Sequence, residues 1–277
     1  MHGDPKILVI DIGNSFTKLG CFVAGQLEFS ECFPTETDDL SQYQEELVES
    51  LPSDGRLQFD GAVIASVVPA AKPLIDQLLS TVFHLSGAQV LWVDREDYPN
   101  LTFGPVDFSM YQPQSLGADR VANAVAGVSQ FPGHKVLVCD FGTTTNFEMV
   151  EDTGHFIGGA ICPGPLKFQS LLTSDHAAQL FEVDVFQKPQ ATPGLSTQVC
   201  LENGLYYGYK GAILEIVGNL LQESHWPLSL VKIIFTGGYA QQVRNMLTLE
   251  IPQVHIDSGL TMKGLYTLWE LNQGVRC

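Results

Sequence analysis

The chain has 277 residues, of which 45% are apolar and 16% charged. This length and composition fit two compact domains of about 100–150 residues each. The formal net charge of −17 disfavours nucleic acid and anionic membranes as partners, because the Lys and Arg residues form no basic patch.

The first residues hold only four strongly apolar side chains before Asp11, too few for the core of a signal peptide. No apolar run reaches the roughly 18 residues of a membrane span. Six cysteines are scattered without a Cys-x-x-Cys pair, so we expect buried, reduced thiols and a cytoplasmic protein. The seven histidines match no zinc-binding pattern.

Two segments of the chain repeat each other. Residues 7–18 read ILVIDIGNSFTK and residues 136–147 read VLVCDFGTTTNF. Each copy has four apolar strand residues, then Asp-x-Gly, then small polar residues. A strand-like run, a turn and another short strand follow in both copies, at 19–33 and 147–159. Each half is therefore predicted to begin with a β-meander whose first turn contains Asp-x-Gly.

The rest of each half alternates strands and helices. In the first half, acids at helical spacing in 38–49 indicate a solvated face, and we expect a strand at 61–68, a helix to Phe83 and a strand at 89–93. A loop at 104–115, rich in Pro, Ser and Gln, leads into a helix at 116–130, where we place the domain boundary. In the second half we expect helices at 164–172 and 196–221, the latter capped by Ser196 or Thr197. A strand at 231–235, a helix from Gln241, a strand at 253–256 and a helix at 261–271 complete an α/β chain.

The repeated turns have the chemistry of a phosphate site. Glycine after a strand lets backbone N–H groups approach an anion closely, and Asn14, Ser15, Thr143 and Thr144 add polar side chains. Asp11 and Asp140 can hold a cation or its waters. One such motif alone is a common turn, but two with matching flanks predict a nucleotide gripped from two domains. The chain has neither G-x-x-x-x-G-K-[ST] nor G-x-G-x-x-G, which excludes P-loop and Rossmann sites.

Further segments extend the pattern in order along the chain: Ala65-Ser-Val-Val-Pro69, Gly117-Ala-Asp-Arg120, Gly158-Gly-Ala-Ile-Cys-Pro-Gly164 and Thr236-Gly-Gly238. With the two turns, they resemble the type III pantothenate kinases of the acetate and sugar kinase, Hsp70 and actin superfamily. The resemblance covers most of the chain. It implies two ribonuclease H-like (actin-like ATPase) domains, at 1–114 and 115–277, each a mixed sheet flanked by helices, with an interdomain cleft.

The resemblance also implies a reaction, the ATP-dependent phosphorylation of pantothenate to 4′-phosphopantothenate, which is the first step towards coenzyme A. It implies Asp119 as the catalytic base. Substrate contacts would come from Tyr111, Gly117, Ala118, Asp119, Arg120 and Thr197. Nucleotide contacts would come from Asp11, Gly13, Asn14, Ser15, Thr17, Lys18, Gly142 and Thr143, and Gly237 could let the adenine or ribose pack on backbone. Asp140 would lie at a monovalent cation, K⁺ or NH₄⁺, in addition to Mg²⁺ on the nucleotide, and a homodimer is implied.

The chain departs from the family pattern at several positions. Ser15 replaces a more usual Thr, and Thr144 and Asn146 stand where Ala and Thr are common. Met110 occupies the place of a substrate-contacting Tyr, with Tyr111 one residue later.

Other interpretations stay open at the level of sequence. Asp119 could be an ordinary acid at a helix start, Arg120 a surface cation, and Lys18 a solvent-facing residue of a strand. The whole protein could be another small-molecule kinase of the superfamily, or a non-catalytic regulatory relative, although that reading predicts the loss of acids that are present here.

Overall fold

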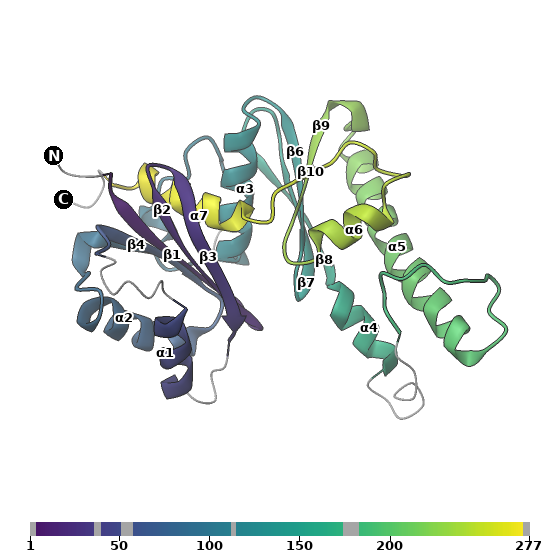
Figure 1. Cartoon of the computed structure of the whole chain (residues 1–277). Helices are drawn as coiled ribbons and strands as arrows, with labels where there is room; N and C mark the ends of the chain where they lie inside the picture. The colour runs from purple at the N-terminus through teal and green to yellow at the C-terminus, as the bar shows by residue number, and fades with distance from the viewer. Residues whose placement is uncertain (1–3, 36–39, 51–57, 112–114, 174–182, 274–277) are drawn as a thin grey trace. The chain divides into compact units, whose positions relative to one another are not determined.

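The computed structural model describes residues 4–35, 40–50, 58–111, 115–173 and 183–273 (Figure 1). Backbone contacts divide the chain into two compact units, one of residues 1–129 and 260–277 and the other of residues 130–259. This division does not coincide with the predicted boundary between residues 114 and 115. Helices α3 (Ala118–Gln130) and α7 (Leu260–Leu271) explain the difference, because they pack closely on each other at Gly264 and Ala122, and α7 also contacts the first sheet.

The first unit is built on a five-stranded mixed sheet in the order β3-β2-β1-β4-β5. Strands β1 (Lys6–Ile12), β2 (Phe16–Val23) and β3 (Gln26–Pro34) form the predicted antiparallel meander. Strands β4 (Gly61–Ser66) and β5 (Val90–Val93) continue parallel to β1. The apolar run that predicted β4 is buried from Gly61 to Ala65, as expected of a central strand.

Helices cover both faces of this sheet (Figure 1). On one face, α1 (Leu40–Glu49) and α2 (Lys72–Thr81) bury Tyr43, Leu47, Ile75 and Leu78 against alternate residues of β1. On the other face, α7 contacts β1 and β4, and Tyr266 stacks on Phe22 with ring centroids 4.5 Å apart. The acids at 38–49 thus belong, from Leu40 on, to a helix with a buried side, which the prediction of a solvated face left out.

The second unit repeats this topology with the strand order β10-β9-β6-β7-β8. Strands β6 (Lys135–Phe141), β7 (Thr144–Val150) and β8 (Phe156–Pro163) form its meander. Strands β9 (Val231–Thr236) and β10 (His255–Ile256) lie parallel to β6. The predicted fold, two mixed sheets flanked by helices, is confirmed.

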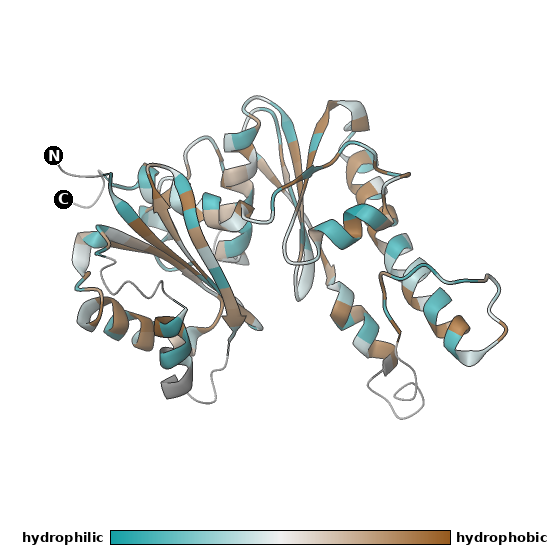
Figure 2. Ribbon diagram, in the orientation of Figure 1, coloured by the Kyte–Doolittle hydropathy of each residue, from teal (hydrophilic) through white to brown (hydrophobic). Residues whose placement is uncertain are grey.

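Helices α4 (Pro165–Thr173), α5 (Thr197–Glu223) and α6 (Ala240–Met246) complete the second unit. The side chain of Ser196 caps α5 by accepting a hydrogen bond from the Val199 N–H, which confirms one of the two predicted caps. Tyr209, Ile213 and Val217 of α5 lie in the core with Phe141 and Phe235. Figure 2 shows long hydrophobic stretches along the strands of both sheets, where these cores form.

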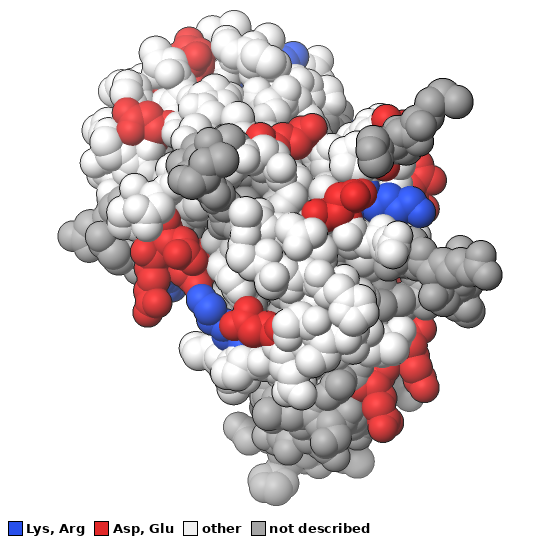
Figure 3. Space-filling model, turned by 90° about the vertical axis from the view of Figure 1, so that its left-hand side faces the viewer, with Lys and Arg blue, Asp and Glu red and all other residues white. Residues whose placement is uncertain are grey.

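The surface charge fits the acidic composition. On the face drawn in Figure 3, acidic side chains are scattered widely and basic ones are few, most of them next to acidic ones. Among the described helices, none is long and apolar enough to cross a membrane.

The cysteines differ in burial, and Cys162 is half-buried. Cys21 and Cys139 are buried as predicted, and burial raises the pKa of the Cys21 thiol to about 11. The prediction was wrong for Cys32 and Cys200, which are exposed. Cys277 lies outside the described residues.

Candidate active site

The first Asp-x-Gly turn joins β1 to β2. It is closed by the Gly13 N–H, which donates to the carbonyl of Phe16 at 3.0 Å. Asn14 is exposed and Ser15 half-buried in the turn. Asp11 lies opposite Lys18 in the antiparallel register, and the Lys18 Nζ is 4.0 Å from the carboxylate. The turn therefore combines exposed polar groups with a lysine on the adjacent strand.

Thr17 points to the other face of the sheet and is fully buried. Its hydroxyl hydrogen-bonds the Tyr43 hydroxyl at 2.7 Å and the Thr35 hydroxyl at 2.9 Å. The side chain predicted to contact nucleotide thus lies in the interior of the first unit, where it attaches β2 to α1.

The second turn joins β6 to β7 and contains Gly142 and Thr143. The Gly142 N–H donates to the carbonyl of Thr144 at 3.0 Å, and the Gly164 N–H donates to that of Thr143 at 3.1 Å. A Cβ on Gly164 would lie 2.1 Å from the Gly142 carbonyl oxygen, so glycine is needed for this approach. The segment of residues 158–164 therefore packs its last residue directly against the backbone of this turn.

Gly237 lies directly against Asp140. It has φ of +87°, and a Cβ there would lie 2.4 Å from Asp140 Oδ1 and 2.6 Å from the carbonyl oxygen of Phe141. The structure thus brings together the predicted metal residue Asp140, the turn at Gly142 and Gly237. Directly across from Asp140 on β7 is the neutral Asn146.

The Gly117-Ala-Asp-Arg segment forms the start of α3. Asp119 lies in the first helical turn, as predicted, and is half-buried. Its Oδ1 is so near Gly117 that a Cβ on that residue would be 2.5 Å away. Arg120 is only 7% exposed, which makes the interpretation as a surface cation wrong. Because Gly117 has no side chain, the Asp119 carboxylate has room to lie against the first residues of the helix.

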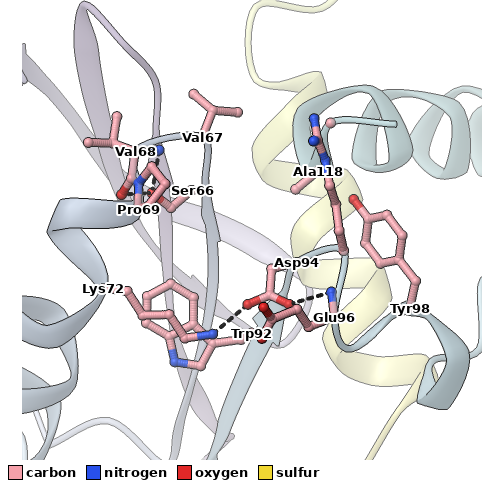
Figure 4. A pocket seen from close by; sticks show the side chains of 12 residues that line it. Ser66, Val67, Val68, Pro69, Lys72, Trp92, Asp94, Glu96, Tyr98 and Ala118 are labelled. Atoms are coloured by element: carbon pink, nitrogen blue, oxygen red, sulfur yellow. Dashed lines mark hydrogen bonds and ion pairs between the residues drawn. The ribbon is translucent and has the colours of Figure 1, made fainter. Parts of the chain in front are cut away.

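A pocket of about 330 Å³ adjoins this helix start, with Gly117 and Ala118 in its lining (Figure 4). Its apolar wall is formed by Val67, Val68, Pro69, Trp92 and Tyr98. A charged side is formed by Lys72, Asp94, Arg95 and Glu96. A cavity with apolar walls and a few placed polar groups is typical of a small-molecule site.

Tyr98 links the pocket to Asp119. Its hydroxyl donates to the carbonyl of Leu116 at 3.1 Å, just before the helix start. Burial and the charge of Asp119 both raise the pKa of the Tyr98 phenol well above its usual range. The phenol therefore stays protonated and keeps its hydrogen bond at any physiological pH.

The other predicted substrate residues lie elsewhere in the chain. Tyr111 is half-buried and its N–H donates to the carbonyl of Phe108 at 3.0 Å. Thr197 is exposed and is the first residue of α5, in the second unit, whereas Asp119 belongs to the first. Their contact with substrate stays a prediction.

Sequence reasoning missed most residues of the pocket lining. Lys72, Trp92, Asp94 and Tyr98 were not predicted as site residues, although Ser66 to Pro69 belong to a segment quoted for the family resemblance. One signal was available: a lysine at the first position of a helix opposes the helix dipole and needs another reason to be there.

Known proteins share the fold of this chain at low sequence identity. A Baf family transcriptional activator from Campylobacter jejuni superposes with a TM-score of 0.59 at 18% identity, over 96% of this chain and 99% of its own. The activator of 2-hydroxyisocaproyl-CoA dehydratase from Clostridium difficile, solved with ADPNP, gives 0.54 at 13% identity, over 97% and 96%. MreB5 of Spiroplasma citri with bound ADP gives 0.54 at 10% identity, over 97% of each chain. These similarities show an actin-like ATPase fold.

The sequence itself gives the closer relationship. A model of the type III pantothenate kinase family matches residues 7–219, which include both Asp-x-Gly turns, the start of α3 and the pocket lining. The chain belongs to the type III pantothenate kinase family.

Proposed function

We propose that this protein transfers the γ-phosphoryl group of ATP to pantothenate, giving 4′-phosphopantothenate and ADP, the first step of coenzyme A biosynthesis. The observation that supports this best is the position of Asp119. It is an acid in the first turn of α3, next to a pocket of about 330 Å³ with room for a small acceptor. The family of the chain supports the choice of acceptor.

In this proposal both Asp-x-Gly turns bind the nucleotide. Backbone N–H groups and the exposed side chains of Asn14 and Thr143 donate to phosphate oxygens. Lys18 adds a positive charge on the first turn's side. Thr17 contributes through its backbone and its strand, since its hydroxyl is bound to Tyr43.

The residues around Asp140 fit a cation with oxygen ligands. The Thr236 hydroxyl, on the strand position that pairs with Asp140, is buried and makes no hydrogen bond within the described part of the chain. Asp140 and Thr236 would hold K⁺ or NH₄⁺, whose charge offsets that of the phosphates. The described residues include no group of three His, Cys, Asp or Glu suited to a metal. In this proposal Mg²⁺ is held by phosphate oxygens of the nucleotide, as it commonly is.

Asp119 would act on the acceptor hydroxyl. The hydroxyl oxygen forms the new bond to the γ-phosphorus, the bond from that phosphorus to the bridging oxygen of ADP breaks, and the hydroxyl proton passes to Asp119. The N-terminal end of a helix favours a negative charge, so the Asp119 carboxylate orients the hydroxyl first and accepts the proton late. Arg120 follows directly, and its planar group suits the charge of the transferred phosphoryl group.

We also propose a homodimer. The second unit exposes hydrophobic side chains on α4, just before α5 and within α5: Leu166, Leu171, Leu172, Leu195 and Tyr207. Burying such a group of side chains between two copies would remove them from water. Native mass measurement tests this, and a monomer at micromolar concentration would contradict it. The cytoplasmic location stays a prediction.

The test of the function is ADP release with and without pantothenate, in K⁺ or Na⁺ as the only monovalent cation. We expect release that requires pantothenate and is faster in K⁺. A panel of sugars and acetate distinguishes another kinase, which would release ADP with one of those acceptors instead. A non-catalytic relative would release none with any acceptor.

A further inference from the structure

The pocket beside α3 has two different ends (Figure 4). At one end, Gly117 and Ala118 lead into Asp119. At the other end, Lys72 at the start of α2 lies with Asp94, which directly follows β5. The apolar lining consists of valines, a proline and two aromatic rings. A molecule lying along this wall would present one end to Asp119 and the other to Lys72.

The ammonium group of Lys72 is held in place. It donates to Asp94 Oδ2 at 2.5 Å and lies 4.8 Å from the centre of the Trp92 ring. Asp94 is fixed in turn, because its Oδ1 accepts from the N–H groups of Glu96 at 3.0 Å and Asp97 at 3.2 Å. The Trp92 indole N–H donates to Asp76 at 2.9 Å. This network orients a cation without using all of its donors, since an ammonium has three and Asp94 takes one.

Lys72 is charged at neutral pH. Burial lowers its pKa, but the hydrogen bond and charge of Asp94, with smaller contributions from Asp97 and Asp76, outweigh burial and raise the pKa. The side chain is 39% exposed, so a ligand can reach it.

Pantothenate has the matching polarity, with a primary hydroxyl at one end and a carboxylate at the other. We propose that Lys72 binds the carboxylate of the acceptor at the end of the pocket away from Asp119, and so selects acidic acceptors. This inference rests on the proposed function. If Lys72 binds the carboxylate, then Arg120, which is buried next to Asp119, binds the transferred phosphoryl group instead.

The structure offers a matched control in Arg95, which also lines the pocket but is exposed. Lys72→Met and Arg95→Met remove one positive charge each. The two variants are assayed with pantothenate and with its uncharged primary amide, and KM and kcat are measured for both acceptors. We expect Lys72→Met to raise the KM for pantothenate by about 10–100-fold, the usual scale for a lost hydrogen bond to a charged group. The KM for the amide should change less than about twofold, since the amide carries no charge.

A second variant guards against misfolding, because Lys72→Met leaves Asp94 without its cation. The double variant Lys72→Met/Asp94→Asn removes both charges and should show the same loss of preference for pantothenate over the amide. Lys72→Arg should keep most of that preference.

Two results would overturn the inference while the proposed function stands. One is an equal rise in KM for both acceptors, which would make Lys72 structural. The other is a charge-selective effect in Arg95→Met alone. If the unaltered protein phosphorylates neither acceptor, the proposed function fails and the role of Lys72 fails with it.

Discussion

The two Asp-x-Gly turns share the same backbone frame, meaning that the strands leading into them have the same length, burial pattern and kind of strand pairing. They differ in the side chains that surround the two acids. Strands β1 and β6 both have seven residues and the same sequence of buried and half-buried positions. Asp11 and Asp140 occupy the same place near the strand ends. Beyond the turns, Thr17 pairs with Ile12 as Thr145 pairs with Phe141. Each threonine is fully buried and hydrogen-bonded to a tyrosine, Tyr43 at 2.7 Å or Tyr209 at 2.9 Å.

These matched pairs show that the second turn is one residue shorter. Asp11 faces Lys18, seven positions on, whereas Asp140 faces Asn146, six positions on. A letter-by-letter comparison sets Thr17 against Asn146, but the structure sets Thr17 against Thr145 and Lys18 against Asn146. The lysine therefore has no counterpart in the second copy, and its place beside the acid is taken by a neutral amide.

The neighbouring strands differ in the same way. Ala65 pairs with Asp11 as Thr236 pairs with Asp140, so the next residues, Ser66 and Gly237, correspond. The first copy accepts a side chain where the second needs glycine. The duplicated frame is thus the same in both copies, while Asp11 faces a lysine and Asp140 faces a neutral amide.

Among the substitutions that test the comparison of the two turns, the largest expected effect comes from making the second copy like the first at this position. Gly237→Ser places a Cβ against Asp140 and the Phe141 backbone, at a φ of +87° that favours glycine. We expect kcat to fall by about 10²-fold, the scale of a misplaced group at an active site. In the matched control, Ser66→Gly should leave kcat within about threefold, because it loses only the two local hydrogen bonds between the Ser66 hydroxyl and the Val68 backbone. Equal losses in the two variants would contradict the comparison.

The next effect concerns the lysine that only the first copy has. Lys18→Met should raise the KM for ATP about tenfold, as a charge-assisted hydrogen bond to phosphate is lost. Lys6→Met, at the other end of the same sheet, makes the same change of net charge and should change KM less than about twofold. A similar KM for ATP in both variants would mean that Lys18 acts only through the net charge of the protein and makes no direct contact with phosphate.

The buried Thr–Tyr pairs predict a smaller, symmetrical effect on stability. Tyr43→Phe and Tyr209→Phe each remove one hydroxyl, and each should lower the free energy of unfolding by about 1 kcal/mol. Both threonines keep another partner, Thr35 in the first unit and Cys162 in the second. Urea denaturation measures the two losses, and a difference of more than about 2 kcal/mol between them would show that the pairs are not equivalent.

The smallest effect is the pH dependence of the Lys72–Asp94 pair, which lies in the first unit. Burial raises the pKa of Asp94, but its hydrogen bond to Lys72 and the charge of that lysine lower it overall. A carboxyl with a lowered folded-state pKa stabilises the fold above its unfolded pKa of about 3.9, and this is lost as pH falls through the folded value. Asp94→Asn should therefore cost up to about 1 kcal/mol at pH 7 and less towards pH 3. A difference that stays constant from pH 7 to pH 3 would contradict this assignment.

Much of the frame could be predicted from sequence because its signals are local. The apolar runs before Asp11 and Asp140 gave both meanders, and Ser196 gave the cap of α5. The position of Asp119 in the first turn of α3 followed from the same kind of pattern. These features depend on neighbours in the sequence, which periodicity and capping rules describe.

The parts that could not be predicted depend on contacts between distant residues. The partnership of Thr17 with Tyr43 decides which face of β2 that threonine serves, and nothing near Thr17 in the sequence indicates it. The pocket wall gathers residues from β4, β5 and the starts of α2 and α3, far apart along the chain. The packing of α7 on β1 likewise joins the C-terminal segment to the first unit, which a division at residue 114 did not foresee.

The most direct test of the account is the rate of acceptor-dependent ADP formation in Asp119→Asn, with ATP binding measured in parallel. The substitution keeps the size of the side chain and removes its charge. We expect turnover to fall by at least about 10²-fold, the usual scale for a positioned base, with the Kd for ATP unchanged. Near-normal turnover in this variant would show that Asp119 does not act on the acceptor, and the assignment of the pocket beside α3 as the acceptor site would fail.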